Sequence, residues 1–429
     1  MNQRIRTHRP LAALPVALMM GVSTLGGLAG NVALAPPATA VASDSGGQCT
    51  FPAEPFEGKP WALQPVLLEQ LWGKTRGGGV SVAVIDSGVD DTHPQLEDAV
   101  DADRGKTYLQ DEKPKDESVT PPDYSDDGTK DVAGHGTRVA GIIAARPKDG
   151  TGFVGLAPEA TIIPIQHNDN IIEGKVGTLA KAITYAVAAG AEVINISQDT
   201  DEPLEPGTSL ERVVQKAIDA GVVIVASAGN DGLRGNVKKT YPASYPGVIA
   251  VAASDRDHER ARFSQPGAFV DIAAPGVDMI STVPGGGHCA ASGTSFSAPF
   301  VAGVAALLVA EHPGWEPRHI EAQLKQTAER SIPGSDRHVG WGVVDPVRAL
   351  TEDARKIEQP VAREGLEAAE PPTPAKLELG ETTAERNERL GTYAVVGGAA
   401  LVAVIGGGSL AYRDWRRRQE RLRGRATPS

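Results

Sequence analysis

Three short segments carry, in chain order, an aspartate, a histidine and a serine beside glycines: Val-Ala-Val-Ile-Asp-Ser-Gly-Val-Asp (82–90), Gly-His-Gly-Thr (134–137) and Gly-Thr-Ser-Phe-Ser-Ala-Pro (293–299). A serine hydroxyl is a poor nucleophile at neutral pH, and a histidine that accepts its proton activates it. A carboxylate on the other ring nitrogen fixes the tautomer and stabilises the imidazolium. Each segment alone has an ordinary explanation: a turn aspartate, a loop histidine or a helix-capping serine. Their joint occurrence predicts a catalytic triad of Asp86, His135 and Ser295.

The elements around these residues place them where open α/β sheets hold their active sites. Asp86 ends an apolar run that is typical of a buried parallel strand, so its carboxylate is expected at the carboxyl edge of a sheet. His135 and Ser295 each begin a predicted helix, at 135–145 and 295–308. The N-terminal dipole of the second helix favours negative charge close to the serine.

Asn230 is a candidate for the group that stabilises an oxyanion. It follows a buried-strand run at 222–226, and its amide is able to donate a hydrogen bond to the oxygen of a tetrahedral intermediate. It also begins the string Asn-Asp-Gly (230–232), which is typical of a turn. Taken without the triad, Asn230 is better explained as a turn residue. Because the triad motifs are also present, we favour its role as an oxyanion donor.

The rest of the central region predicts a doubly wound sheet. Short β-branched runs alternate with amphipathic stretches; the runs lie at 161–165, 192–197, 222–226 and 248–252, and the stretches at 178–189, 209–220 and 316–329. This alternation predicts a three-layer α/β fold with a mostly parallel sheet.

With these motifs, residues 72–350 resemble the subtilisin (S8-type) family of serine peptidases, in which the triad follows the same chain order. Flanking strings make the chain most similar to the mycosins, the membrane-anchored proteases of actinobacterial type VII secretion systems: Pro-Trp-Ala-Leu (60–63), Leu-Trp-Gly-Lys-Thr-Arg-Gly-Gly-Gly-Val (71–80) and Gly-Trp-Gly-Val-Val-Asp-Pro (340–346). The resemblance implies a subtilisin-like fold and serine endopeptidase activity on polypeptides. It also implies that Ser197 and Gln198 belong to a strand edge that pairs with extended substrate.

The chain departs from the family's pattern in two places that matter. Gln95 stands where many subtilases carry an aspartate that binds calcium, so neither a metal site nor a cofactor is predicted. Residues 43–79 are too few for the folded inhibitory pro-domain of secreted subtilisins, because so short a segment rarely has a core. The acidic stretch at 101–131 is interpreted as a surface insertion beside the active site, either for a partner or merely tolerated.

Cys49 and Cys289 are the two cysteines of the chain. An exported location permits a disulfide, and Cys289 lies six residues before Ser295. We hypothesise that the two pair and hold the N-terminal extension permanently against the catalytic face. Two unpaired thiols are the rival interpretation.

Both ends of the chain indicate export and membrane anchoring. Residues 1–42 are typical of a signal peptide, with three arginines before an apolar stretch, although an uncleaved signal anchor is the alternative. Residues 390–412 contain no charge and are long enough to span a bilayer. Seven arginines and two acids follow at 413–425, and the positive-inside rule places them in the cytoplasm.

The predicted order is a signal peptide (1–42), an N-terminal extension (43–79), a peptidase domain (80–350), a solvated linker (351–389), a transmembrane helix (390–412) and a basic tail (413–429). Subtracting the +3 of residues 1–42 and the +5 of residues 413–429 from the net −12 leaves −20 for residues 43–412. An acidic exterior argues against a nucleic-acid partner. A basic nucleic-acid tail is the less favoured interpretation of the C-terminus, because a spanning segment precedes it directly.

Together these features predict a single-pass membrane protein with an extracytoplasmic serine endopeptidase domain that serves a type VII secretion system. Two alternatives from other classes stay open. One is a structural or docking component of the secretion complex, in which proteolysis is secondary or absent. The other is an inactive protease that is retained for binding, against which the intact triad motifs argue.

Overall fold

The computed structural model of the 429-residue chain describes residues 49–110, 112–114, 116, 118–169, 172, 174–198, 207–234, 238–362 and 381–423. The chain divides into a unit that ends at Arg363 and a second that begins at Glu364. The predicted signal peptide, residues 363–380 of the predicted linker and residues 424–429 of the predicted tail lie outside the described residues.

A seven-stranded sheet, in which every neighbouring pair is parallel, forms the centre of the first unit. Its strands lie in the order β2 (Lys106–Thr107), β3 (Thr161–Gln166), β1 (Ser81–Asp86), β4 (Val193–Ile196), β5 (Val223–Ser227), β6 (Val248–Ser254) and β7 (Ile272–Pro275). The four predicted runs fall on β3 to β6, with ends that differ by one or two residues. The predicted subtilisin-like α/β fold with a mostly parallel sheet is therefore confirmed.

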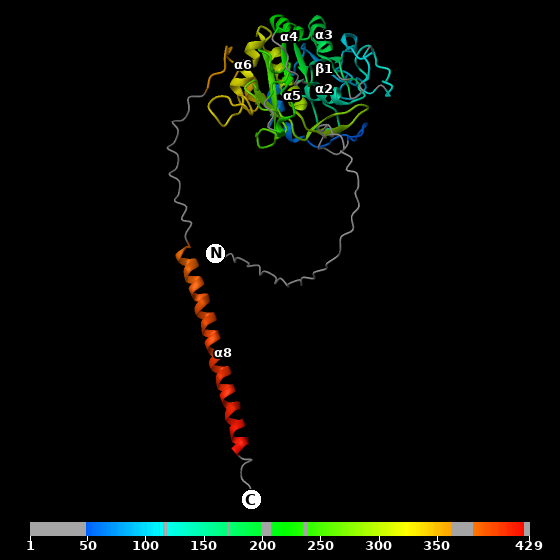
Figure 1. Ribbon diagram of the computed structural model, residues 1–429. Coiled ribbons are helices and arrows are strands. Elements are labelled where there is room, and N and C mark those ends of the chain that lie inside the picture. Colours follow the sequence, from blue (N-terminus) through cyan, green and yellow to red (C-terminus); the bar gives the residue numbers. More distant parts are fainter. Residues whose placement is uncertain are drawn as a thin grey trace. The chain divides into compact units, whose positions relative to one another are not determined.

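Helices cover both faces of this sheet (Figure 1). In β1, Val82 and Val84 pack into the core that contains α2 and α5, whereas Ala83 and Ile85 pack on the opposite face with α3 and α4. Alternate residues of a strand point to opposite faces. A strand that is covered on both faces therefore has apolar residues at consecutive positions. The covering helices are α2 (His135–Ala144), α5 (Thr294–Glu311), α3 (Val176–Ala188) and α4 (Ser209–Asp219).

Shorter elements complete the first unit. They are η1 (Trp61–Leu63), α1 (Leu68–Trp72), η2 (Ala102–Arg104), η3 (Gly232–Arg234), α6 (Pro317–Thr327), α7 (Pro346–Thr351) and the antiparallel pair β8 (Met279–Thr282) and β9 (His288–Ala291).

The strand order places the functional candidates together. The first strand of the chain, β1, lies between β3 and β4: the chain adds β2 and β3 on one side of it and then crosses to add β4 to β7 on the other. In open parallel sheets such a reversal opens a crevice at the carboxyl ends of the strands. Asp86 at the end of β1, His167 directly after β3 and Ser197 directly after β4 therefore meet at one edge.

Residues 49–54 of the N-terminal extension lie against β9 and the turn that precedes it. Cys49 forms a disulfide with Cys289 of β9, across a sequence separation of 240 residues. The amide of Ala53 donates to Gly286 O at 3.0 Å, and the amide of His288 donates to Glu54 O at 3.1 Å. On chain-entropy grounds, closing a loop of this length stabilises the fold by roughly 5 kcal/mol.

The extension reaches the residue that precedes His135. Gly134 has a left-handed φ of 72°, and a Cβ added there would lie 3.0 Å from the ring of Phe51 and 3.1 Å from Pro284. Glycine is required at this position both by the backbone angle and by this close packing. The start of α2 is therefore packed against the extension.

The segment after residue 350, for which a solvated linker is predicted, makes contacts with the first unit. His312 Nε2 lies 2.8 Å from Asp353 Oδ2, and His319 Nε2 lies 3.1 Å from Glu358 Oε1. Asp353 is 8% exposed. The acidic composition of this segment suggested solvation, but two histidines of the domain give its carboxylates partners.

The second unit contains one long helix, α8 (Thr383–Arg423). The helix contains the predicted span, and an 18-residue window of it has a mean hydropathy of 2.0 and is not buried inside the protein. The core helix α5 is also long and apolar, but 78% of its apolar window is buried in the first unit. By length and composition α8 is therefore the candidate for a membrane span among the described helices.

Candidate active site

Asp86 and His135 form a short polar contact at the catalytic edge. Asp86 is fully buried, and its Oδ1 lies 2.7 Å from Nδ1 of His135. Because a carboxylate only accepts, Nδ1 carries the proton, which leaves Nε2 with the lone pair of a general base. The second oxygen, Oδ2, is buried and has no hydrogen-bond partner among the described residues. Oδ1 also accepts from the backbone amide of Ser87 at 2.7 Å, so the imidazole shares this oxygen with one backbone donor.

A second buried carboxylate, Asp131, holds the helix that carries the histidine. It accepts hydrogen bonds from Gly134 N at 2.8 Å, Thr137 N at 2.9 Å, Thr137 Oγ1 at 2.6 Å and Ser87 Oγ at 2.8 Å. Ser87 Oγ in turn accepts from Gly136 N at 2.9 Å. The first amides of a helix have no partner within it, and here they bond to side chains that follow β1 and precede α2.

The two carboxylates set the electrostatics of the imidazole. Burial lowers the pKa of His135, but the charge and hydrogen bond of Asp86 and the charge of Asp131 outweigh burial, so the pKa lies above its ordinary value of 6.5. Burial raises the pKa of Asp131 to about 6, aided by the charge of Asp86 and opposed by the hydrogen bonds from Thr137 and Ser87. The side chain of His135 is 30% exposed, so a substrate is able to reach it.

Ser295 is the second residue of α5, and its neighbour Phe296 contacts the His135 ring with a centroid distance of 5.3 Å. Ser295 Oγ donates to the carbonyl of Ser197 at 3.0 Å. In the described part of the chain no hydrogen bond joins Ser295 to His135. Rotation about the serine χ1 redirects the hydroxyl, and catalytic hydrogen bonds often tighten only when substrate is bound.

Ser197 is held by a reciprocal contact that depends on a proline. Pro299 is the sixth residue of α5, beyond the first turn where its missing N–H would cost least. Without that N–H the Ser295 carbonyl lacks its helical donor four residues on. The hydroxyl of Ser197 donates to this carbonyl at 3.0 Å and itself accepts from Asn195 Nδ2 at 2.8 Å. The nucleophile's backbone is thus fixed to the end of β4.

Asn230 lies in the loop after β5, beside the residue that precedes the serine. Its Oδ1 accepts from Thr294 N at 2.9 Å and from Thr294 Oγ1 at 3.1 Å. The amide nitrogen lies on the other side, 3.7 Å from the place of a Cβ added to Gly293. Because both bonds fall on the oxygen, the amide orientation is fixed and the nitrogen is left beside Gly293. The role of Asn230 as an oxyanion donor stays a prediction.

Replacement of Asn230 by alanine tests this role. We expect kcat to fall by about 10²–10³ with little change in KM, because the hydrogen bond forms only in the transition state. That magnitude was measured in subtilisin for the loss of one such donor. Steady-state kinetics with a peptide substrate decide the matter, and a change mainly in KM or in thermal stability would return Asn230 to a structural role.

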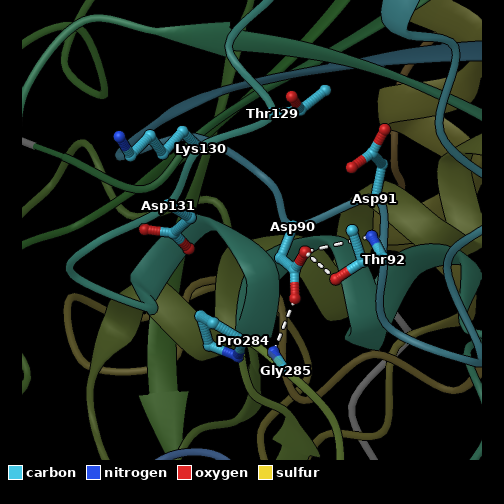
Figure 2. A pocket seen from close by; sticks show the side chains of 8 residues that line it. All are labelled: Asp90, Asp91, Thr92, Thr129, Lys130, Asp131, Pro284 and Gly285. Carbon is cyan, nitrogen blue, oxygen red and sulfur yellow. Dashed lines mark hydrogen bonds between the residues drawn. The ribbon is translucent and has the colours of Figure 1, made fainter. Parts of the chain in front are cut away.

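A pocket of about 390 Å³ lies behind the start of α2 (Figure 2); it is lined by Asp90, Asp91, Thr92, Thr129, Lys130, Asp131, Pro284 and Gly285. Asp90 is tied down, since it accepts from Thr92 N at 3.0 Å and from Gly285 N at 2.6 Å. Burial raises the pKa of Asp91, as do the charges of Asp90 and Asp127. The lining residues include three aspartates and one lysine, so this pocket is acidic.

The remaining predicted site residues occupy defined places. Gln198 follows Ser197, and its Oε1 lies 2.6 Å from His167 Nε2. Gln95 is 1% exposed, and its Nε2 donates to Arg146 O at 2.8 Å and to Phe153 O at 3.0 Å. Within the described ranges, no group of three or more His, Cys, Asp or Glu side chains is arranged to hold a metal ion.

Three residues that support the site were not identified from sequence: Asp131, Ser87 and His167. Asp131 precedes the predicted helix by four residues, a spacing at which a capping carboxylate is plausible. It ends a stretch that is rich in aspartate, however, and nothing in that composition distinguishes the buried member. The polar insertion before it contributes β2 and the small apolar contact of Leu109 with Tyr124 to the fold.

Comparison with known proteins agrees with this geometry. Residues 77–342 match the model of the subtilase family of peptidases. The chain is 37% identical over 297 residues to the thermophilic serine proteinase of Bacillus sp. (strain AK1), covering 69% of this chain and 68% of that protein. It is 36% identical over 270 residues to subtilisin E of Bacillus subtilis (strain 168), covering 63% of this chain and 65% of that protein.

Among solved structures, the MycP3 protease from the type VII (ESX-3) secretion system is similar. It has a TM-score of 0.61 and 31% sequence identity, and the likeness covers 70% of this chain and 90% of that one. The predicted resemblance to mycosins is therefore confirmed at the level of structure.

Proposed function

Since this chain belongs to the subtilase family of serine peptidases, we propose that it is a serine endopeptidase whose triad is Asp86, His135 and Ser295. The observation that carries the proposal is the 2.7 Å contact between Asp86 and His135, on the same edge that presents Ser295 from the start of α5. No metal or cofactor is needed for acyl transfer by these groups.

In the proposed reaction, Nε2 of His135 accepts the proton of Ser295 Oγ while that oxygen attacks the scissile carbonyl. The imidazolium that forms is stabilised by Asp86, which keeps its own negative charge. The Asn230 amide and the dipole of α5 stabilise the oxyanion. His135 then returns the proton to the leaving amine, and water hydrolyses the acyl-enzyme by the same route.

We further propose that an extended polypeptide pairs with the main chain at Ser197 and Gln198. Two observations support this proposal. Both residues directly follow β4, and Ser197 forms two hydrogen bonds with Ser295, the proposed nucleophile. Extended main chain bound at a sheet edge gives affinity that is largely independent of side chains, and adjacent pockets add preference.

The membrane arrangement is the second part of the proposal. An unburied apolar helix, α8, follows the peptidase unit, and the MycP3 neighbour comes from a type VII secretion system. Arginines at the end of α8 favour a cytoplasmic C-terminus. The enzyme would then act on polypeptides at the outer face of the cytoplasmic membrane, as part of such a system.

Truncation after Arg389 tests the anchoring. The shortened protein is expected to leave the membrane fraction as a soluble enzyme with unchanged kcat/KM, because the triad and its supports all lie before residue 350. External protease on intact cells should remove the peptidase unit and spare an epitope placed at residue 429. Digestion of that epitope in intact cells would reverse the assigned orientation.

A further inference from the structure

His167 connects the two strand ends that flank the catalytic aspartate. Its backbone N–H donates to the carbonyl of Asp86 at 3.0 Å. Its ring is 4% exposed, and Nε2 lies 2.6 Å from Oε1 of Gln198. A carboxamide oxygen only accepts, so Nε2 carries the proton and donates it to Gln198. One side chain thus joins the end of β3 to the residue that follows Ser197.

The ring is enclosed on its other side and is held neutral. A Cβ added to Gly174 would lie 2.2 Å from His167 Cε1, so the Gly174 backbone packs directly on the imidazole. Burial lowers the pKa of His167 to about 4, against the hydrogen bond to Gln198 and the charge of Asp86. With the proton on Nε2, the nitrogen Nδ1 holds a buried lone pair without a partner among the described residues. An unpaired buried acceptor costs free energy that an apolar ring of the same shape would not.

The hydrogen bond from His167 to Gln198 is the interaction that an apolar ring at this position would not make. Gln198 is the last described residue before the gap at 199–206, and no other hydrogen bond of its side chain is recorded among the described residues. Ser197, one residue earlier, is fixed to Ser295 through two hydrogen bonds of 3.0 Å. Ser197 is therefore held from the nucleophile's side and Gln198 from the side of β3.

We propose that His167 is a positioning residue that holds the Ser197–Gln198 edge in the extended form to which a polypeptide substrate binds. This inference rests on the proposed peptidase function. It adds how the enzyme binds the substrate residues on the acyl side of the scissile bond. His167 makes no contact with the reacting atoms, so its effect is on binding of long substrates. A substrate too short to reach the edge is insensitive to it.

The test compares two substrates of the ectodomain that ends at Arg389. One is a tetrapeptide anilide that pairs with the edge, and the other is a small acyl ester without residues to pair. His167→Phe keeps a planar ring and removes the donor. We expect its KM for the tetrapeptide to rise about 3- to 10-fold, the effect of one lost hydrogen bond, while kcat and the ester kcat/KM stay within about twofold.

Three further variants separate positioning from packing. Gln198→Leu is expected to raise the tetrapeptide KM similarly, and His167→Phe/Gln198→Leu no more than either single change, because both break the same bond. His167→Gln, which keeps a donor at the same reach, should restore most of the loss. His319→Phe is the matched control, since His319 is 1% exposed and also bonds through Nε2, but to Glu358 away from the edge.

The results that overturn the inference are equally definite. Equal losses for the ester and the tetrapeptide, additive losses in the double variant, or an unchanged tetrapeptide KM each exclude positioning. Where His167→Phe does not fold, Gln198→Leu against wild type makes the same comparison. Retained hydrolysis in Ser295→Ala would instead contradict the proposed function itself, so the two failures are distinguishable.

Discussion

Replacement of Ser295 by alanine is expected to abolish peptide hydrolysis by the ectodomain while leaving it folded. In subtilisin, a relative of this chain, loss of the nucleophile lowers kcat by about 10⁶. No other side chain takes its place, since Oγ is the atom that forms the acyl-enzyme. Fold should persist, because the change removes one hydrogen bond, from Ser295 to Ser197 O, worth about 1 kcal/mol.

The measurement is release of new N-termini from an unstructured polypeptide, with the thermal unfolding midpoint recorded on the same samples. Ser292→Ala is a matched control, since Ser292 lies three residues earlier and its Oγ accepts from Asp278 N at 2.9 Å, away from the triad. Equal hydrolysis by wild type and Ser295→Ala would show that another group is the nucleophile.

Asp86→Asn carries the second-largest expected effect, a fall in kcat of about 10⁴. An asparagine amide donates to Nδ1 of His135 and so favours the tautomer with the proton on Nε2. That nitrogen then has no lone pair with which to accept the serine proton. The side-chain volume is nearly unchanged, so the domain is expected to fold and the loss to appear in kcat.

The same variant changes the pH dependence in a defined direction. Hydrolysis needs neutral His135, so kcat/KM rises as pH increases through the pKa of this residue, which the acids hold above 6.5 against the effect of burial. Removing the charge of Asp86 takes away the largest raising influence. The acid limb of the residual activity should therefore move to lower pH, and an unmoved or raised limb would contradict the assigned electrostatics.

Much of this fold was predictable because its signals are local. Strands buried on both faces read as apolar runs, and those runs predicted β3 to β6 almost to the residue. The three catalytic candidates were identifiable because their types, glycine neighbours and order occur together.

The supports of the site were not predictable, because they depend on contacts between distant segments. Asp131 is one aspartate of an acidic stretch until the fold buries it against Ser87. The Ser197 hydroxyl bonds to the Ser295 carbonyl, which Pro299 leaves without its helical donor, and that contact joins segments about 100 residues apart. The contacts of Asp353 with His312 and of Glu358 with His319 were not predictable either, since composition does not reveal partners that are distant in the sequence.

Covalent labelling with a fluorophosphonate tests the central claim most directly. An activated serine displaces fluoride and forms a stable bond to phosphorus, so the purified ectodomain should gain one adduct per molecule on the peptide that contains Ser295. Hydrolysis should fall in proportion to labelling, and Ser295→Ala should gain no adduct at all. An adduct of equal amount in Ser295→Ala, or full hydrolysis by the fully labelled enzyme, would contradict the assignment of Asp86, His135 and Ser295 as the catalytic triad.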